Sequence, residues 1–333
     1  MPHLIETMAY VGETPWHQLG NVLPPHQSLD VWARQAGMDW TICESPVRYA
    51  AGAASAGAEA DRASLRDFED HKVLYRSDTH AALAVVGRRY EVVQPGTVLE
   101  FYRDLTEHSG FELETAGVLK AGRKFWALAR TGAQATLQGR DVVHGYVLLA
   151  TSCDGSLATT VTPTSVRVVC ANTLAMAVEG ATGAVRVPHN TVFDPQAVKQ
   201  KLGIAVSGWD GFMYRMKQLA ERKVKHAEAE RFLCQVLAPA TLAPSAQGGS
   251  TRPVPVMPGQ VLKKIQSLYD GHGRGAELGA AKGTAWGLLC AVTEYVDHER
   301  RARSVDHRLD SAWFGQGAGL KQRALEAALA LTA

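Results

Sequence analysis

The residues best suited to chemistry in this chain are basic side chains that stand next to aromatic ones. This pattern occurs twice, in the segments Arg123–Trp126 and Arg88–Tyr90. Proteins bind single-stranded nucleic acid by neutralising phosphates with Arg and Lys while bases stack on aromatic rings, which contributes about 1–3 kcal/mol per base. Both segments are therefore candidate nucleic-acid contacts. The alternative at the first segment is a solvated turn above a core tryptophan.

A second candidate lies where a β-branched run, Val166–Val169, meets a stretch rich in Ala, Leu and Met. Arg167 could hold a phosphate there, assisted by backbone N–H groups at the start of a helix over Asn172–Val178. Two alternatives stay open. Arg167 could instead form an internal ion pair with Asp154 or Asp141, and Asn172 could serve only as the helix N-cap.

Further basic residues lie in the second half of the chain, where residues 191–333 hold 19 Lys and Arg against 13 Asp and Glu. Such a surplus suits a polyanion, although it also suits an ordinary solvated helical surface. The full set of candidate nucleic-acid-binding residues is Arg88, Arg89, Arg123, Lys124, Trp126, Arg167, Asn172, Lys223, Lys225, Arg300, Arg301 and Arg303.

An enzymatic reading uses acidic residues instead. Glu112 and Glu114 share one face of an expected strand, and with Asp141 and Lys120 they could form the metal site of a nuclease. Alternating carboxylates on a solvated strand explain the same pattern. The sequence contains no GxxxxGK[ST], GxGxxG, HExxH or GxSxG motif. We therefore expect no nucleotide-driven motor, no catalytic residue outside the nuclease alternative, and no cofactor or bound metal.

Composition sets broad limits. The chain has 333 residues, of which 46% are hydrophobic and 20% charged, and a net charge of +2, as in an ordinary globular protein. The five cysteines form no CxxC pair, which disfavours a zinc site and fits a reducing compartment. Neither a signal peptide nor a membrane-spanning run is evident, so we expect a cytoplasmic protein with no membrane partner.

The elements that must position these residues predict an α+β fold. The sheet is antiparallel and built from hairpins, helices pack on it, and a helical C-terminal region follows. Its predicted strands include Phe111–Val118, Lys124–Arg130, Val142–Thr151 and Leu157–Thr162, and predicted helices cover Ser28–Gly37 and Thr97–His108. The predicted organisation is a sheet domain at 1–190, a helical extension at 191–237, a flexible linker at 238–259 and a C-terminal helical region at 260–333.

Several blocks of the sequence resemble a family of phage and plasmid-like proteins, domain of unknown function 932. The matching blocks are Met8–Gly20, Arg89–Gln94, Ser152–Gly155, Val166–Thr173 and Gly283–His298. The resemblance implies a mobile-element setting and an accessory role in DNA metabolism. The order helix, antiparallel hairpins, helix over Thr97–Val178 is also similar to the core of Rad52-like single-strand annealing proteins, which is an analogy of element order alone.

Together these observations favour an ATP-independent protein that binds single-stranded DNA of a phage or plasmid and promotes annealing in recombination or replication. Its partners would be single-stranded DNA and further copies of itself, in a ring or filament that offers a continuous groove. The metal-dependent nuclease is one alternative. A protein-binding accessory factor that counters host defence is another.

Overall fold

The structure is a computed structural model, and it describes residues 5–12, 20–51, 64–169, 172–178, 181–238 and 259–332. The chain divides into two compact units, each assembled from three stretches of sequence. Unit 1 comprises residues 1–131, 147–162 and 184–203. Unit 2 comprises residues 132–146, 163–183 and 204–333. Most of the predicted linker, residues 239–258, lies outside the described residues.

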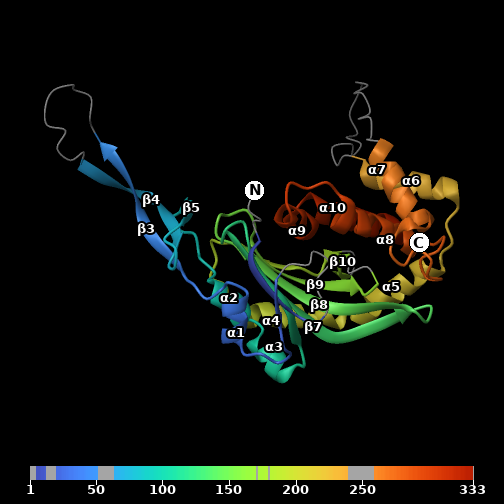
Figure 1. Ribbon diagram of the computed structural model, residues 1–333, viewed down its shortest axis with the longest axis horizontal. Coiled ribbons are helices and arrows are strands. Elements are labelled where there is room, and N and C mark those ends of the chain that lie inside the picture. Colours follow the sequence, from blue (N-terminus) through green and yellow to red (C-terminus); the bar gives the residue numbers. More distant parts are fainter. Residues whose placement is uncertain are drawn as a thin grey trace. The chain divides into compact units, whose positions relative to one another are not determined.

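Within the described residues the main sheet has eight strands in the order β10-β9-β8-β7-β6-β1-β2, with β13 also paired to β9 (Figure 1). Strand β6 pairs antiparallel with β1 and β7, β9 pairs antiparallel with β10 and β13, and β1 pairs with β2 in parallel. Its strands are β1 (Ile5–Val11), β2 (Asn21–Leu23), β6 (Glu112–Leu119), β7 (Lys124–Leu137), β8 (Asp141–Ser152), β9 (Thr159–Arg167), β10 (Asn172–Ala175) and β13 (Val185–Val187). The predicted hairpins are thus confirmed, although β7 and β9 are longer than predicted.

A separate sheet in unit 1 consists of β3 (Ile42–Ala51), β4 (Ser64–Arg76) and β5 (Ala82–Gly87). Strand β5 pairs only with the His71–Tyr75 part of β4, so the rest of β3–β4 is a two-stranded ribbon. Large apolar side chains are exposed on this ribbon, at Tyr49, Leu65 and Phe68. A short β11 (Ala177–Val178) and β12 (Ala181–Thr182) form the remaining pair.

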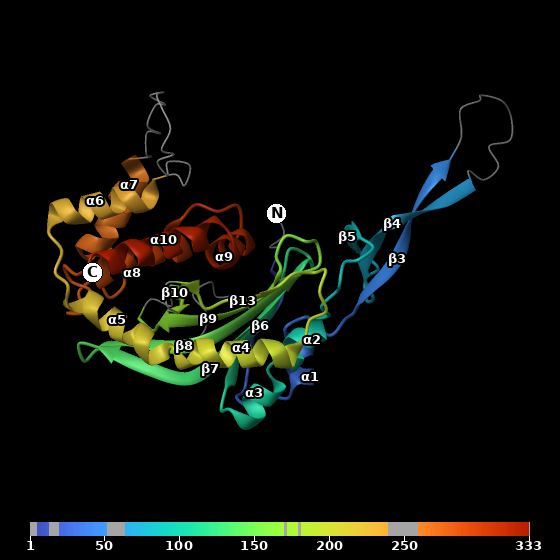
Figure 2. The same cartoon turned by 180° about the vertical axis from the view of Figure 1, so that it is seen from behind.

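The helices confirm the α+β class and the helical C-terminal region. They are α1 (Leu29–Gln35), α2 (Pro95–Glu100), α3 (Arg103–His108), α4 (Pro195–Ser207), α5 (Trp209–Glu221), α6 (His226–Leu237), α7 (Gly259–Ser267), α8 (Ala285–Glu294), α9 (Val305–Phe314) and α10 (Gln316–Ala330). Two π-helical turns, η2 (Leu268–His272) and η3 (Tyr295–Glu299), follow α7 and α8. In unit 2, α8 and α10 pack against β10 (Figure 2). No helix among the described residues is long and apolar enough to cross a membrane.

Local sequence accounts for several of these elements. Ser28 accepts a hydrogen bond from the Val31 amide and caps α1, as its side chain predicts. The β6–β7 turn runs through Lys120, Ala121 and Gly122, all with positive φ, as a tight hairpin requires. The single helix predicted over Thr97–His108 is instead the pair α2 and α3.

The helix predicted over Asn172–Val178 is wrong. Asn172 opposes Arg167 and Ala175 opposes Thr164 in an antiparallel pairing, so Asn172 begins strand β10 and is not a helix N-cap. Helix propensity in this Ala-, Leu- and Met-rich stretch is outweighed by pairing with β9 and by packing on α8 and α10. The annealing-protein analogy had relied on this helix as its closing element.

Candidate functional site

A pocket of about 600 Å³ in unit 2 gathers the basic residues that follow η3. Its lining residues are Val296, Arg300, Arg301, Ala302, Arg303, His307, Arg308 and Ser311. Four arginines and a histidine thus face one cavity, and no carboxylate is among the residues that line it. We call this cavity the arginine pocket.

The chain makes this pocket by leaving a π-helical turn and entering a new helix within a few residues. Turn η3 ends at Glu299, and α9 starts at Val305 after a non-helical stretch. The Ser304 hydroxyl fixes the start of α9, because it accepts a hydrogen bond from the backbone N–H of His307 at 3.2 Å. The same hydroxyl lies 2.8 Å from Nδ1 of His307 and orients the imidazole. The basic side chains therefore leave the backbone from a short, capped connection.

Two of the arginines form the walls. Arg300 donates to Oε1 of Gln316 at 3.0 Å and to the hydroxyl of Ser311 at 3.4 Å. Arg308 donates to the backbone carbonyl of His298, which ties α9 to the preceding turn. None of these acceptors is a carboxylate, so the contacts of Arg300 leave the positive charge of its guanidinium group uncompensated.

Arg301 and Arg303 differ from these two residues. Both side chains are exposed, and neither forms a hydrogen bond or ion pair with any described residue. A guanidinium group offers five N–H donors in a planar fork that matches phosphate oxygens. The arrangement therefore suits a phosphate-bearing ligand, held by two free arginines over a wall of two positioned ones.

Asp297, which precedes the basic run in the sequence, forms hydrogen bonds in the interior of unit 2. Asp297 accepts from Nζ of Lys321 at 2.8 Å and from the Thr173 amide at 3.0 Å. Lys321 also donates to the Thr173 hydroxyl at 2.8 Å, and both charged side chains are buried. Asp297 thus anchors β10 to α10 and does not line the arginine pocket.

Arg167 lies in the interior, where it forms the ion pair with Asp141 that the sequence left open. Its Nε and Nη2 donate to the carboxylate of Asp141 at 2.7–3.0 Å, and it also donates to the backbone carbonyls of Arg274 and Gly275. Nε1 of Trp286 donates to the same carboxylate at 2.9 Å. Arg167 and Asp141 are 3% and 1% exposed, so in this structure the guanidinium is out of reach of a ligand in solution.

In the basic–aromatic segment at the β6–β7 turn, one basic residue is exposed and the other is buried with the tryptophan. Arg123 is exposed, whereas Lys124 and Trp126 are only 4% and 2% exposed and belong to the interior of unit 1. The Trp126 ring therefore offers no stacking face to solvent in this structure. Of this segment, Arg123 alone presents its charge at the surface.

Arg88 and Arg89 are exposed in the turn that follows β5. The hydroxyl of the next residue, Tyr90, donates to the Ser152 carbonyl at 2.9 Å, and its ring stacks on His189 at 4.4 Å. Partial burial raises the pKa of Tyr90 to about 12, so its hydroxyl remains a donor even near pH 10, where a solvated tyrosine is half ionised.

The turn after β8 brings these two basic segments to one end of the sheet. The amide of Cys153 donates to the Arg123 carbonyl at 2.9 Å, beside the Ser152 carbonyl that Tyr90 binds. Arg88, Arg89 and Arg123 are exposed cations of unit 1 on segments that both contact the end of β8.

Lys223 and Lys225 lie between α5 and α6, and both are exposed. Nζ of Lys223 donates to the carbonyl of Lys282 at 3.2 Å, a contact that leaves its charge uncompensated. These lysines are not among the residues that line the arginine pocket.

The carboxylates of the nuclease alternative have different surroundings. Glu112 and Glu114 line a pocket of unit 1, whereas both oxygens of Asp141 are bonded in the interior of unit 2. The part of the chain that the structure describes contains no group of three or more His, Cys, Asp or Glu side chains placed to hold a metal ion.

Sequence reasoning found three of the arginines in the pocket and missed His307, Arg308 and Ser311. The signal was available in part. Arg300, Arg301 and Arg303 are followed by the N-cap Ser304, so the next basic residues, His307 and Arg308, lie in the first turn of a helix that starts beside them.

Comparison with known proteins places the chain in a family. It belongs to the family described as Domain of unknown function (DUF932), whose model matches residues 82–313, well over half of the sequence. That range contains the whole arginine pocket. No curated protein and no solved structure matches the chain.

Proposed function

We propose that the protein binds single-stranded DNA through phosphate contacts in the arginine pocket, without nucleotide hydrolysis. The observation that supports this most strongly is the lining itself, four arginines and a histidine with no carboxylate. Phosphate contacts of this kind supply the sequence-independent part of nucleic-acid affinity. In unit 1, the exposed Arg88, Arg89 and Arg123 are further candidate phosphate contacts.

Strand annealing in phage or plasmid recombination or replication is the biological role that we propose for this binding, in the cytoplasm. The pocket is lined by no Phe, Tyr or Trp side chain, so it would hold the backbone and leave the bases exposed for pairing. Annealing of long strands would need several copies side by side, which is why we propose a ring or filament. The lack of a nucleotide-binding motif in the sequence agrees with an ATP-independent reaction.

The first experiment measures binding of a fluorescent single-stranded oligonucleotide by anisotropy over a series of salt concentrations. We compare the wild type with the double variant Arg301→Ala/Arg303→Ala and with Lys263→Ala, a control that removes an exposed cation of unit 2 outside the pocket. Each phosphate contact contributes about 0.7 to the slope of log K against log salt for single strands. The double variant should lower the slope by about 1.4, and the control should leave it unchanged.

The proposal fails if the wild type shows no salt-dependent binding, or if the control variant weakens binding as much as the double variant does. Annealing is then tested with two complementary fluorophore- and quencher-labelled oligonucleotides without ATP. Faster quenching with strands of unchanged length supports annealing, whereas shortened strands would indicate the nuclease. Light scattering after size-exclusion chromatography reports whether the protein forms the proposed oligomer.

A further inference from the structure

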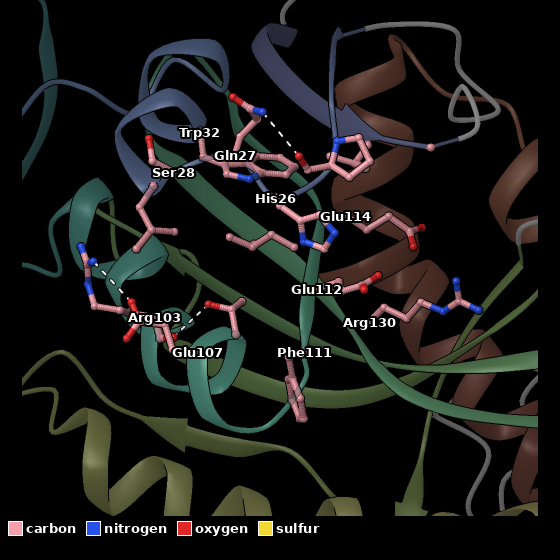
Figure 3. Close-up of a pocket in the computed structure, with 16 residues that line it drawn as sticks. His26, Gln27, Ser28, Trp32, Arg103, Glu107, Phe111, Glu112, Glu114 and Arg130 are labelled. Carbon is pink, nitrogen blue, oxygen red and sulfur yellow. Dashed lines mark hydrogen bonds and ion pairs between the residues drawn. The ribbon is translucent and has the colours of Figure 1, made fainter.

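Unit 1 contains a second cavity, of about 670 Å³, whose chemistry is different from that of the arginine pocket. It lies between the β2–α1 connection, helix α3 and the start of β6 (Figure 3). Its polar lining includes His26, Arg103, Glu107, Glu112, Glu114 and Arg130. We call this cavity the glutamate pocket.

Two backbone irregularities point polar side chains into it. In the β6–β7 pairing, Leu113 opposes Ala129 and Thr115 opposes Leu128, so Glu114 is the extra residue of a β-bulge. A bulge turns its side chains away from strict alternation, and both Glu112 and Glu114 line the pocket. His26 has a φ of 59°, a conformation that is uncommon for a residue other than glycine.

Carboxylates outnumber guanidinium groups among the residues that line the glutamate pocket. Arg103 is held by Glu100 at 2.6 and 2.7 Å and lies 3.7 Å from Glu107, so carboxylates already neutralise it. Arg130 is the other guanidinium of the lining, and it opposes Glu112 across the strand pair. Three glutamates thus line the cavity with two arginines, one of which also pairs with a glutamate outside it.

Glu112 is the carboxylate best placed for a ligand. It is exposed, and it forms no hydrogen bond or ion pair with any described residue. His26, Glu112 and Glu114 all line the cavity, and Figure 3 labels the three side chains. The imidazole of His26 likewise has no partner among the described residues.

Apolar side chains form the remaining wall. Trp32 is only 2% exposed and Leu113 is 8% exposed, and Val11 and Leu29 line the cavity with them. An apolar wall next to the unpaired carboxylate of Glu112 matches an amphipathic cation, in which an alkyl stem carries a charged head. Phosphates would be repelled by the same carboxylates, so this cavity is not a continuation of the proposed DNA contact.

We propose that the glutamate pocket binds an alkyl guanidinium or alkyl ammonium group. The head would be held by Glu112 and Glu114, and the stem would lie against Trp32 and Leu113. A carboxylate binds guanidinium through two parallel N–H···O bonds, and this geometry is available to Glu112, which has no other described partner. The group can belong to a free amine or to the Arg or Lys side chain of a basic peptide, because the recognised chemistry is the same.

The test uses pairs of probes that differ only in charge, measured by titration calorimetry on the full chain. Butylguanidinium is compared with neutral butylurea, and an acetylated Gly-Arg-Gly amide is compared with its citrulline analogue. We expect the charged member of at least one pair to bind and the neutral member to bind at least about tenfold more weakly, because a hydrogen bond to a charged group contributes about 1.5–3 kcal/mol. Binding of butylguanidinium indicates a free amine, and binding of the peptide alone indicates a protein partner.

Variants then locate the site. Glu112→Gln and Glu114→Gln should each weaken the charged probe about tenfold, whereas Glu69→Gln, an exposed carboxylate on β4, should not. Circular dichroism confirms that each variant is folded. Equal binding of charged and neutral probes, no binding of either pair, or full binding to folded Glu112→Gln overturns the proposal. Oligonucleotide binding by the same variants is measured separately, so that a failure here is distinguished from a failure of the DNA-binding proposal.

Discussion

Replacement of Asp141 by Asn should destabilise the protein far more than the same replacement in an exposed ion pair. In the wild type the Asp141 carboxylate accepts three hydrogen bonds from Arg167, at 2.7, 2.8 and 3.0 Å, and one from Trp286 at 2.9 Å. An Asn amide presents an NH₂ group to these donors and leaves the buried guanidinium of Arg167 without the carboxylate that it is hydrogen-bonded to. Breaking a buried ion pair on one side costs about 3–5 kcal/mol. The folding equilibrium should therefore fall between about a hundredfold and several thousandfold.

Urea unfolding followed by circular dichroism measures this free energy of unfolding. Asp67→Asn is the matched control, because Asp67 pairs with Arg48 at 2.8 Å while both side chains are 56% exposed, and exposed pairs contribute less than about 1 kcal/mol. The double replacement Asp141→Leu/Arg167→Met removes both charges and should be less destabilising than Asp141→Asn alone. If Asp141→Asn stays within about 1 kcal/mol of the wild type, the buried pair does not have the role described here.

Other predictions concern thiol reactivity and close backbone approach. Burial raises the pKa of Cys153 to about 12, so at pH 8 only about one thiol in ten thousand is ionised, and limited alkylation read by mass spectrometry should label exposed Cys234 long before Cys153. Gly287→Ala would place a Cβ against the backbone carbonyl of Ala281 and should lower the unfolding midpoint. Gly211→Ala, in α5 with open space around it, should raise stability by about 0.5–1 kcal/mol, and equal effects of the two changes would contradict the packing described.

Local sequence signals were enough to predict most of the sheet and its hairpins. Gly122 and the alternating apolar residues around it specify the β6–β7 turn through short-range chemistry alone. The same holds for α1, where Ser28 supplies the cap. Such elements are predictable because the residues that stabilise them are near one another in the chain.

The segment after Arg167 shows where local reasoning fails. The Thr173 amide and hydroxyl bond to Asp297 and Lys321, which lie more than a hundred residues further along the chain. No local pattern contains these partners, and they favour an extended backbone over the helix that composition predicts. For Arg167 the sequence narrowed the partner to two aspartates, and the strand pairing that brings Asp141 to it emerged only from the fold.

The two pockets also differ in how far they could be predicted from local sequence. The arginine pocket is formed by one continuous stretch, residues 296–311, so the basic run could be recognised in the sequence. The glutamate pocket draws on four separate segments, and its bulge at Glu114 and its positive φ at His26 have no sequence signature that we could identify.

The interleaving of the two units has a consequence for how the chain is made. A ribosome completes residues 132–146 and 163–183 of unit 2 before residues 184–203 of unit 1 have been synthesised. Strands β7, β8 and β9 each contain residues of both units, and residues 204–333 of unit 2 follow the last residue of unit 1. In the nascent chain, apolar strand residues of unit 2 stay uncovered until α8 and α10 have been synthesised. Chaperones can bind this exposed apolar surface during that interval. Truncation at any single position between residues 132 and 203 leaves both units incomplete.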